Sequence, residues 1–155
     1  MISNKFVVWA ILFSTLFSQL PMNAYHDVPA CYRDLEEHFF VPEVVARALS
    51  LHNVYQSQWN IIVTDLQRRS QEVHRIIDAR AKHMSPDPLN RPIQPKEAKE
   101  LLLEVLFEIF VDVMHQRDFT SQADIREMFN YIRRQQSERL KTCFGIEDKI
   151  LEPKS

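Results

Sequence analysis

The chain has 155 residues, of which 45% are apolar and 26% are charged, and its formal net charge is −2. This length and composition are typical of one soluble domain with one hydrophobic core. The only glycine is Gly145, whereas phosphate-binding loops, dinucleotide-binding folds and tight hairpin turns need glycine at several defined positions. The composition therefore excludes Rossmann, P-loop and all-β folds, and the near-neutral charge argues against a nucleic-acid partner.

The first 24 residues have the order of a secretory signal peptide. Lys5 precedes an apolar run over 6–20, and no acidic residue occurs before Asp27. The run is shorter than the roughly 20 residues that a membrane-spanning helix needs. We therefore expect residues 1–24 to be a cleaved signal peptide and residues 25–155 to form a single helical domain. The alternative is an uncleaved anchor, which would make the protein a membrane-tethered structural protein.

A signal peptide predicts export, either to the bacterial periplasm or out of the cell. None of the asparagines has a Ser or Thr two residues later, so the chain lacks the N-glycosylation pattern of eukaryotic secreted proteins. This absence fits a bacterial periplasm better than a eukaryotic secretory route.

Cys31 and Cys143 are the only cysteines and lie near opposite ends of the mature chain. In an oxidising compartment we expect them to form one disulfide. The alternatives are two separate buried thiols and, at Cys31, lipidation of a weak lipoprotein motif that begins at Val28. No nucleophile signature surrounds either cysteine, and a glycine-framed serine elbow is missing. The sequence thus predicts a protein that is not an enzyme.

Apolar periodicity predicts an all-α fold, a small helical bundle. After a short amphipathic stretch over 32–40, apolar residues recur at steps of four and three from about 42 to 83 without proline or glycine in between, which predicts one long helix. A helix of ~42 residues would be ~63 Å long, too long for a compact domain of this size. It must therefore bend or project, with the polar stretch 65–72 as the first expected break and His52-Asn53 as the second.

The second half of the chain is predicted to form a helical hairpin. Four prolines make 85–95 a stiff extended connection. Two helices follow, at about 96–116 and 121–143, and the short turn between them favours an antiparallel pair. The first of these helices is apolar on nearly all sides, so we expect protein to surround most of it. Gly145 supplies the final helix stop.

The expected projection, around 67–84, carries an apolar stripe on a polar helix. Such a stripe needs a partner surface, which is either the chain's own proline-rich return or a second copy of the chain. We therefore interpret the protein as an exported binding protein that acts through protein–protein interaction, for example as an envelope adaptor, a chaperone-like factor or a secreted effector. The residues expected to contact the partner are Arg69, Val73, Ile76, Ile77 and Arg80.

The helix over 96–116 presents acidic residues and a histidine at steps of three or four, so that they share one face. The candidate metal ligands on this face are Glu104, Glu108, Asp112 and His115. Asp112-Val113-Met114-His115 resembles a variant of the Glu-x-x-His element of ferritin-like di-iron bundles, although no second element with that spacing occurs. We interpret the face as a solvated polar stripe, with one surface metal ion as the alternative, and we expect no cofactor.

Basic residues gather on the last helix, among them Arg126 and Arg133, but glutamates interleave with them. We interpret this region as a solvated face, with an acidic partner or an anionic lipid head group as the alternative.

His52 falls on the seam of the long helix, where we expect a buried, hydrogen-bonded histidine.

Overall fold

The computed structural model describes residues 29–84 and 94–149, and the expected all-α class is confirmed there. The expected signal peptide, 1–24, and most of the proline-rich connection lie outside the described residues. None of the described helices is both long and apolar enough to cross a membrane. The helices are α2 (Ala30–His38), α3 (Pro42–Leu51), α4 (Gln56–Ser70), α5 (Val73–Met84), α6 (Pro95–Gln116), α7 (Gln122–Gln135) and α8 (Ser137–Phe144).

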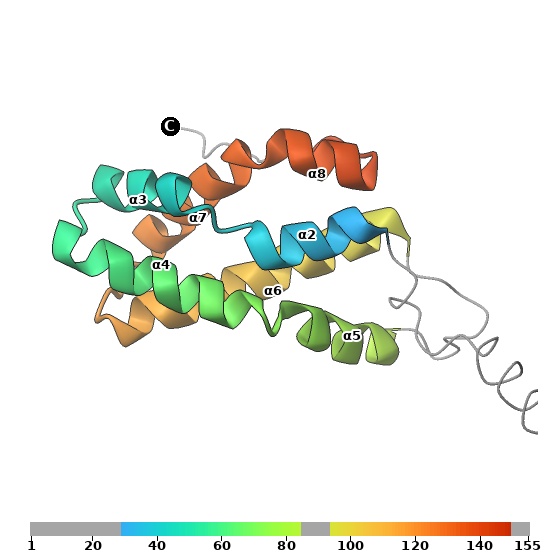
Figure 1. Cartoon of the computed structure of the whole chain (residues 1–155), viewed down its shortest axis with the longest axis horizontal. Coiled ribbons are helices and arrows are strands. Elements are labelled where there is room, and N and C mark those ends of the chain that lie inside the picture. Colours follow the sequence, from blue (N-terminus) through green and yellow to red (C-terminus); the bar gives the residue numbers. More distant parts are fainter. Residues whose placement is uncertain (1–28, 85–93, 150–155) are drawn as a thin grey trace, which may run out of the picture.

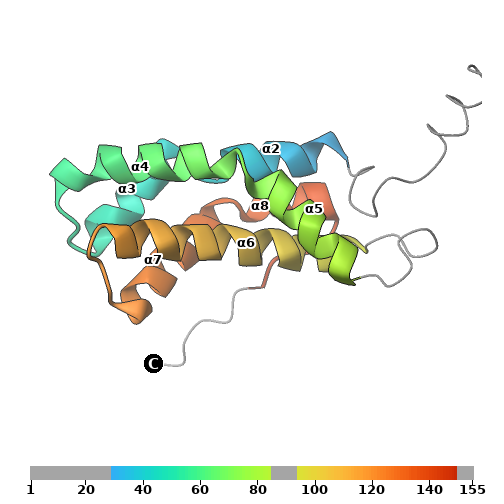
Figure 2. The same ribbon diagram turned by 90° about the horizontal axis from the view of Figure 1, so that it is seen from below.

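The helices are arranged in four antiparallel rows, three of which consist of two helices each. The first row is α2 with α3, the second is α4 with α5, the third is α6 alone, and the fourth is α7 with α8 (Figure 1). Each row packs against the next, and contacts of α3 with α7 and of α2 with α8 close the ring. Figure 2 shows α6 running along the bundle between α4 and α7. The topology is that of an up-down-up-down four-helix bundle with broken rows.

A single helix over 42–83 does not form, because the chain reverses direction after α3, at His52-Asn53, the second of the two expected breaks. Asn53 has a φ of 60°, and its N–H donates to the carbonyl of Ser50 over 3.3 Å. The N–H of Val54 donates to the carbonyl of Leu49 over 3.1 Å. These two bonds form a Schellman motif, which normally uses glycine but also accepts asparagine. The stretch 42–83, which was expected to form one helix, therefore forms helices of two neighbouring rows.

A second interruption separates α4 from α5 inside the stretch that was expected to break. Ser70 is buried, and its hydroxyl donates to the carbonyl of Leu66 over 2.7 Å, an interaction that often bends helices. However, α5 does not project, because it packs against α2 and α6. Val73 and Ile77 are completely buried. The exposed apolar stripe expected here is thus wrong, since the chain's own core covers it.

The expected C-terminal hairpin is confirmed, with one additional break. A second Schellman motif ends α6, in which Asp118 has a φ of 61° and the N–H of Phe119 donates to the carbonyl of Met114. The last expected helix is divided at Gln136 into α7 and α8. The buried side-chain amide of Gln136 donates to the carbonyl of Phe39 over 3.0 Å, so the break also connects the fourth row to the first.

Aromatic rings join three of the rows at the centre of the core. Phe110 of α6 lies with its ring centroid 6.1 Å from that of Phe40 and 5.9 Å from that of Phe129. Phe39, at the end of α2, lies 5.8 Å from Phe129. The short junction between α2 and α3 therefore inserts two rings between α6 and α7, where they bury a large apolar area.

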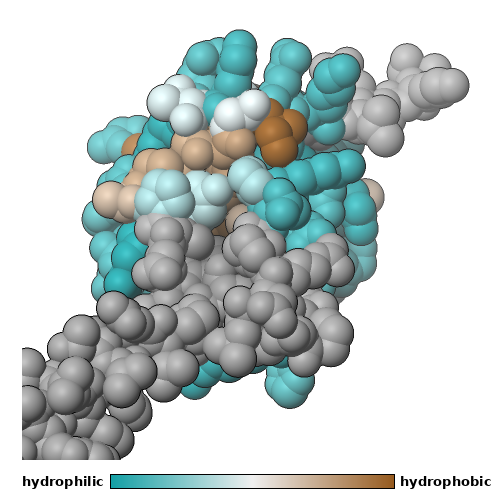
Figure 3. Space-filling view, turned by 90° about the vertical axis from the view of Figure 1, so that its right-hand side faces the viewer, coloured by the Kyte–Doolittle hydropathy of each residue, from teal (hydrophilic) through white to brown (hydrophobic). Residues whose placement is uncertain are grey.

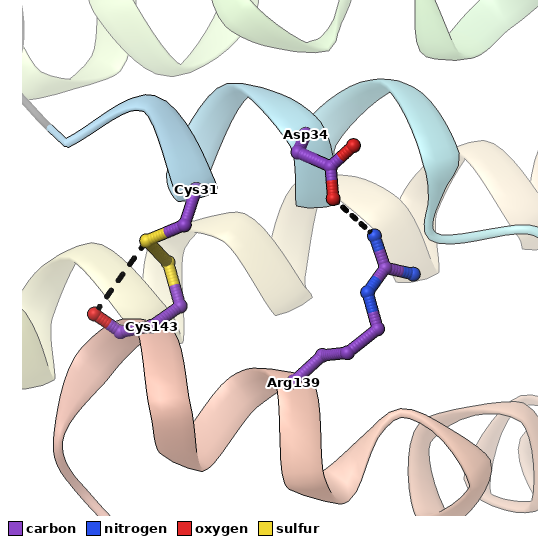
Figure 4. Close-up of a disulfide and its surroundings, with 4 residues drawn as sticks. All are labelled: Cys31, Asp34, Arg139 and Cys143. Carbon is purple, nitrogen blue, oxygen red and sulfur yellow. Dashed lines mark hydrogen bonds and ion pairs between the residues drawn. A yellow bond between two sulfur atoms is a disulfide. The ribbon is translucent and has the colours of Figure 1, made fainter.

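The expected disulfide between Cys31 and Cys143 is present. It joins α2 to α8 with 5.7 Å between the two Cα atoms, and an ion pair between Asp34 and Arg139 lies beside it (Figure 4). Because the Cys31 sulfur is bonded to Cys143, it has no thiol to carry a lipid. The bridge spans 112 positions of the sequence and fixes the last helix to the first row.

The end of the bundle at which α5 ends and α6 begins is mainly hydrophilic. Figure 3 shows polar residues over most of the described surface there, with a small group of apolar residues between them. The described surface in this view therefore resembles an ordinary solvated end of a bundle more than a broad apolar docking face.

The burial of α5 predicts different effects for two neighbouring isoleucines. Ile77→Ala should lower the free energy of unfolding by about 2–5 kcal/mol, because it leaves a cavity in the core. Ile76 is only partly buried, so Ile76→Ala should cost less than about 1 kcal/mol. Urea unfolding followed by circular dichroism measures both values. A larger loss for Ile76 than for Ile77 would contradict the orientation of α5.

The disulfide should make a large contribution to stability because it closes a long loop. Replacing Cys31 and Cys143 together with alanine should lower the free energy of unfolding by about 2–5 kcal/mol. Urea unfolding of the unchanged protein with a reducing agent is the control and should give a similar loss. Equal stability of the oxidised and reduced proteins would show that the bridge contributes nothing.

Candidate functional site

The acidic face of α6 is occupied by arginines of the second row. Arg80 of α5 donates to Glu108 over 3.1 Å, and it lies 3.7 Å from Glu104. The hydrogen bond to Glu108 raises the pKa of Arg80 above its ordinary value. Arg69 of α4 lies 3.3 Å from Asp112. These ion pairs connect α4 and α5 to α6. The acidic residues of α6 therefore help to hold the second and third rows together.

The proposed ligands on α6 do not converge on one point. The Nε2 atom of His115 lies 2.9 Å from the side-chain amide of Gln122. Within residues 29–84 and 94–149, one group of three side chains could hold an ion, namely His52, Asp124 and Glu127. There, Nδ1 of His52 faces Asp124 at 3.4 Å and Nε2 faces Glu127 at 3.8 Å. Because each nitrogen faces a different carboxylate, the geometry is that of a histidine held between two acids.

The five residues expected to contact a partner are used mainly within the chain. Val73 and Ile77 belong to the core, and Ile76 packs against it. Arg69 and Arg80 bind the acidic face of α6. The prediction of a contact surface on α5 therefore loses the exposed stripe on which it depended.

A groove of about 280 Å³ lies on the adjacent side of α6, between α6 and α7. Leu103, Phe107 and Phe129 line it, and Leu103 and Phe129 are otherwise almost completely buried. The rings of Phe107 and Phe129 meet edge to face with 5.1 Å between their centroids. The groove is thus apolar and aromatic at its base, and it is close to the size of a small ligand pocket.

The two walls of this groove carry opposite charges. The polar residues that line it are Glu100 and Glu104 from α6 and Arg126, Asn130 and Arg133 from α7. The guanidinium of Arg126 lies 5.5 Å from the ring centroid of Phe107, a cation–π contact. Among the described residues no ion pair joins the two walls, and none includes Glu100 or Arg126, so these two charges remain available to a ligand that enters between the walls.

Arg133 also fixes the segment that follows α8. The side chain of Asp148 is completely buried and accepts hydrogen bonds from Arg133 Nε over 2.6 Å and from Lys99 Nζ over 3.3 Å. Burial alone would raise the pKa of Asp148, but the hydrogen bonds and charges of Arg133 and Lys99 outweigh it and lower that pKa. Asp148 is therefore held as a carboxylate at one end of the groove.

A second hollow, of about 290 Å³, lies beside the disulfide. Its charged residues are Asp34, Glu138 and Arg139, of which Asp34 and Arg139 pair with each other over 2.6 Å (Figure 4). Arg139, the positive charge that lines this hollow, is thus already paired within the protein, whereas Arg126 of the α6–α7 groove has no ion pair among the described residues.

A buried acid links α2 to α5 in the other half of the bundle. Glu36 is completely buried, and its Oε2 lies 2.9 Å from Nδ1 of His74. Asp78 lies 3.9 Å from the other ring nitrogen. This group ties the first row to the second, and neither partner lines the two hollows described above.

The basic residues of the last helix were expected to form a solvated face, whereas Arg126 and Arg133 line the groove. The available signal was spacing, because Arg126, Asn130 and Arg133 follow steps of four and three and so share one face of α7. Glu100, Leu103 and Phe107 do the same on α6. What the spacing alone did not show is that these two faces meet.

Comparison of the chain with known protein families, with curated proteins and with solved structures finds no match.

Asp148→Asn should lower the free energy of unfolding at neutral pH by about 1.5–3 kcal/mol, because it removes charged hydrogen bonds to Arg133 and Lys99. The pKa of Asp148 is lower in the folded than in the unfolded chain. Its stabilisation is therefore present above the ordinary carboxyl pKa and is lost as the pH falls through the lowered value. Urea unfolding between pH 7 and pH 2 should show the two proteins converging in acid.

The neighbouring Glu147 is exposed and offers a matched control for this experiment. Glu147→Gln should change the free energy of unfolding by less than about 0.5 kcal/mol. Equal losses for Glu147→Gln and Asp148→Asn would refute the buried ion pair.

Proposed function

We propose that the protein is exported and acts, without catalysing a reaction, by binding a segment of another protein chain in the α6–α7 groove. The observation that carries this proposal is the pair of oppositely charged walls above an aromatic base, with no ion pair between them among the described residues. The base offers area for apolar side chains, and the walls offer Arg126 and Glu100 for charged ones. An adaptor, a chaperone-like factor or a secreted effector could each use such a groove.

Export is supported by the signal-like order of residues 1–24 and by the disulfide. Structural disulfides persist in secreted and periplasmic proteins and are rare in the reducing cytosol. If the N-terminal segment were retained, the same binding would take place at a membrane surface.

Binding fits the described side chains of the groove better than catalysis does. The polar groups that line it are carboxylates, guanidiniums and one amide, and one of the carboxylates, Glu104, also contacts Arg80. An aromatic base between charged walls offers the apolar contacts and ion pairs with which a peptide ligand binds.

Photo-crosslinking tests the location of the binding site. A benzoylphenylalanine in place of Asn130, which lines the groove but is not one of the charged contacts, should give a protein adduct in the native host. Adding Arg126→Glu should reduce its yield about tenfold, equivalent to about 1.4 kcal/mol of binding free energy. Arg134 is exposed on α7 and does not line the groove, so Arg134→Glu is the matched control and should leave the yield unchanged.

The proposal fails if the adduct is insensitive to Arg126→Glu. It also fails if a photo-crosslinker at Gln67, an exposed position of α4, gives the same adduct in equal yield.

A further inference from the structure

The chain reaches the groove before it leaves the described residues. Gly145, with a φ of 70°, ends α8 and lets the backbone turn. Asp148 then binds Arg133, which is itself part of the groove wall, and Lys99, which precedes Glu100 of the other wall. The segment that follows Lys149 therefore starts at one end of the groove.

The groove has a length that a few residues can cover. Arg133 and Arg126 are seven positions apart on α7, which corresponds to about 10 Å along the helix. An extended chain advances about 3.3 Å per residue. The four residues over 149–152 therefore reach from the Asp148 anchor to Arg126.

The sequence of this segment matches the groove in order and in chemistry. Ile150 and Leu151 are apolar, like the aromatic base, and Glu152 follows them with a negative charge. Arg126, at the far end of the groove, has the opposite charge. Pro153 comes next and provides no N–H for further regular pairing.

We infer that residues 150–152 bind in the α6–α7 groove of their own chain and compete there with the partner segment. This inference rests on the proposed function of the groove and adds its regulation. Because the segment is tethered, its effective concentration is of millimolar order. An intrinsic Kd of about 0.1 mM then keeps the groove about 90% occupied and weakens partner binding about tenfold.

A fluorescent peptide with the sequence of residues 149–155 tests the inference in the full-length, oxidised protein. Ile150→Ser with Leu151→Ser should free the groove, so fluorescence anisotropy should show about tenfold tighter peptide binding than to the unchanged protein. Adding Arg126→Glu to this variant should abolish the gain, whereas adding Arg134→Glu should preserve it. Absent or equal peptide binding to the unchanged protein and the serine variant would overturn the inference.

The side-chain amide of Asn130 gives a second measurement inside the groove. Its ¹⁵N NMR signal should shift on Ile150→Ser with Leu151→Ser and should stay in place on Lys154→Ser, which lies beyond the matching segment. An unchanged Asn130 signal in both variants would also overturn the inference.

The crosslinking experiment separates this inference from the proposed function. If the serine variant binds the peptide tightly but gives no partner adduct, the tail occupies the groove and the proposed partner function fails. If the adduct forms at equal yield with and without the serine substitutions, the tail inference fails and the partner function stands.

Discussion

The whole bundle depends on two residues that reverse the backbone without glycine. Asn53 and Asp118 adopt φ values of 60° and 61°, a conformation in which most side chains are strained but asparagine and aspartate are tolerated. Asn53 sets α4 antiparallel to α3, and Asp118 sets α7 antiparallel to α6. Without these reversals the faces of α6 and α7 would not meet, and neither the closed core nor the groove would exist.

Sequence patterns were sufficient for the helical class, the disulfide and the C-terminal hairpin, because each depends on composition or on local periodicity. The break at His52-Asn53 was ranked second and its reversal of the chain was not predicted, since an asparagine in a Schellman motif looks the same in sequence as an exposed helical asparagine. The position of α5 was missed for another reason. Arg69 and Arg80 bind side chains on α6 that are 43 and 28 positions away, and periodicity carries no information about such pairs. The apolar stripe was therefore recognised correctly but assigned to a partner instead of the core.

The uninterrupted helix α6 explains why the groove could not be predicted from one helix at a time. Its polar residues serve two different neighbours: Glu108 and Asp112 bind the second row, whereas Glu100 faces the fourth. Glu104 lies between these uses, because it contacts Arg80 and also lines the groove. On the sequence all four belong to one acidic stripe. Only the register between α6 and α7 decides which of them face the basic residues of α7 at a distance that leaves room for a ligand.

Stability and the proposed binding share residues at the end of α8. The disulfide fixes α8 to the first row, and Asp148 fixes the following segment to Lys99 and Arg133. Arg133 therefore serves both as an internal ion-pair partner and as part of the groove wall, so its guanidinium is held in position before any ligand arrives. Preorganised charges of this kind lose less conformational entropy on binding than mobile surface charges do. The anchor that stabilises the segment after α8 thus also holds one end of the groove wall in place.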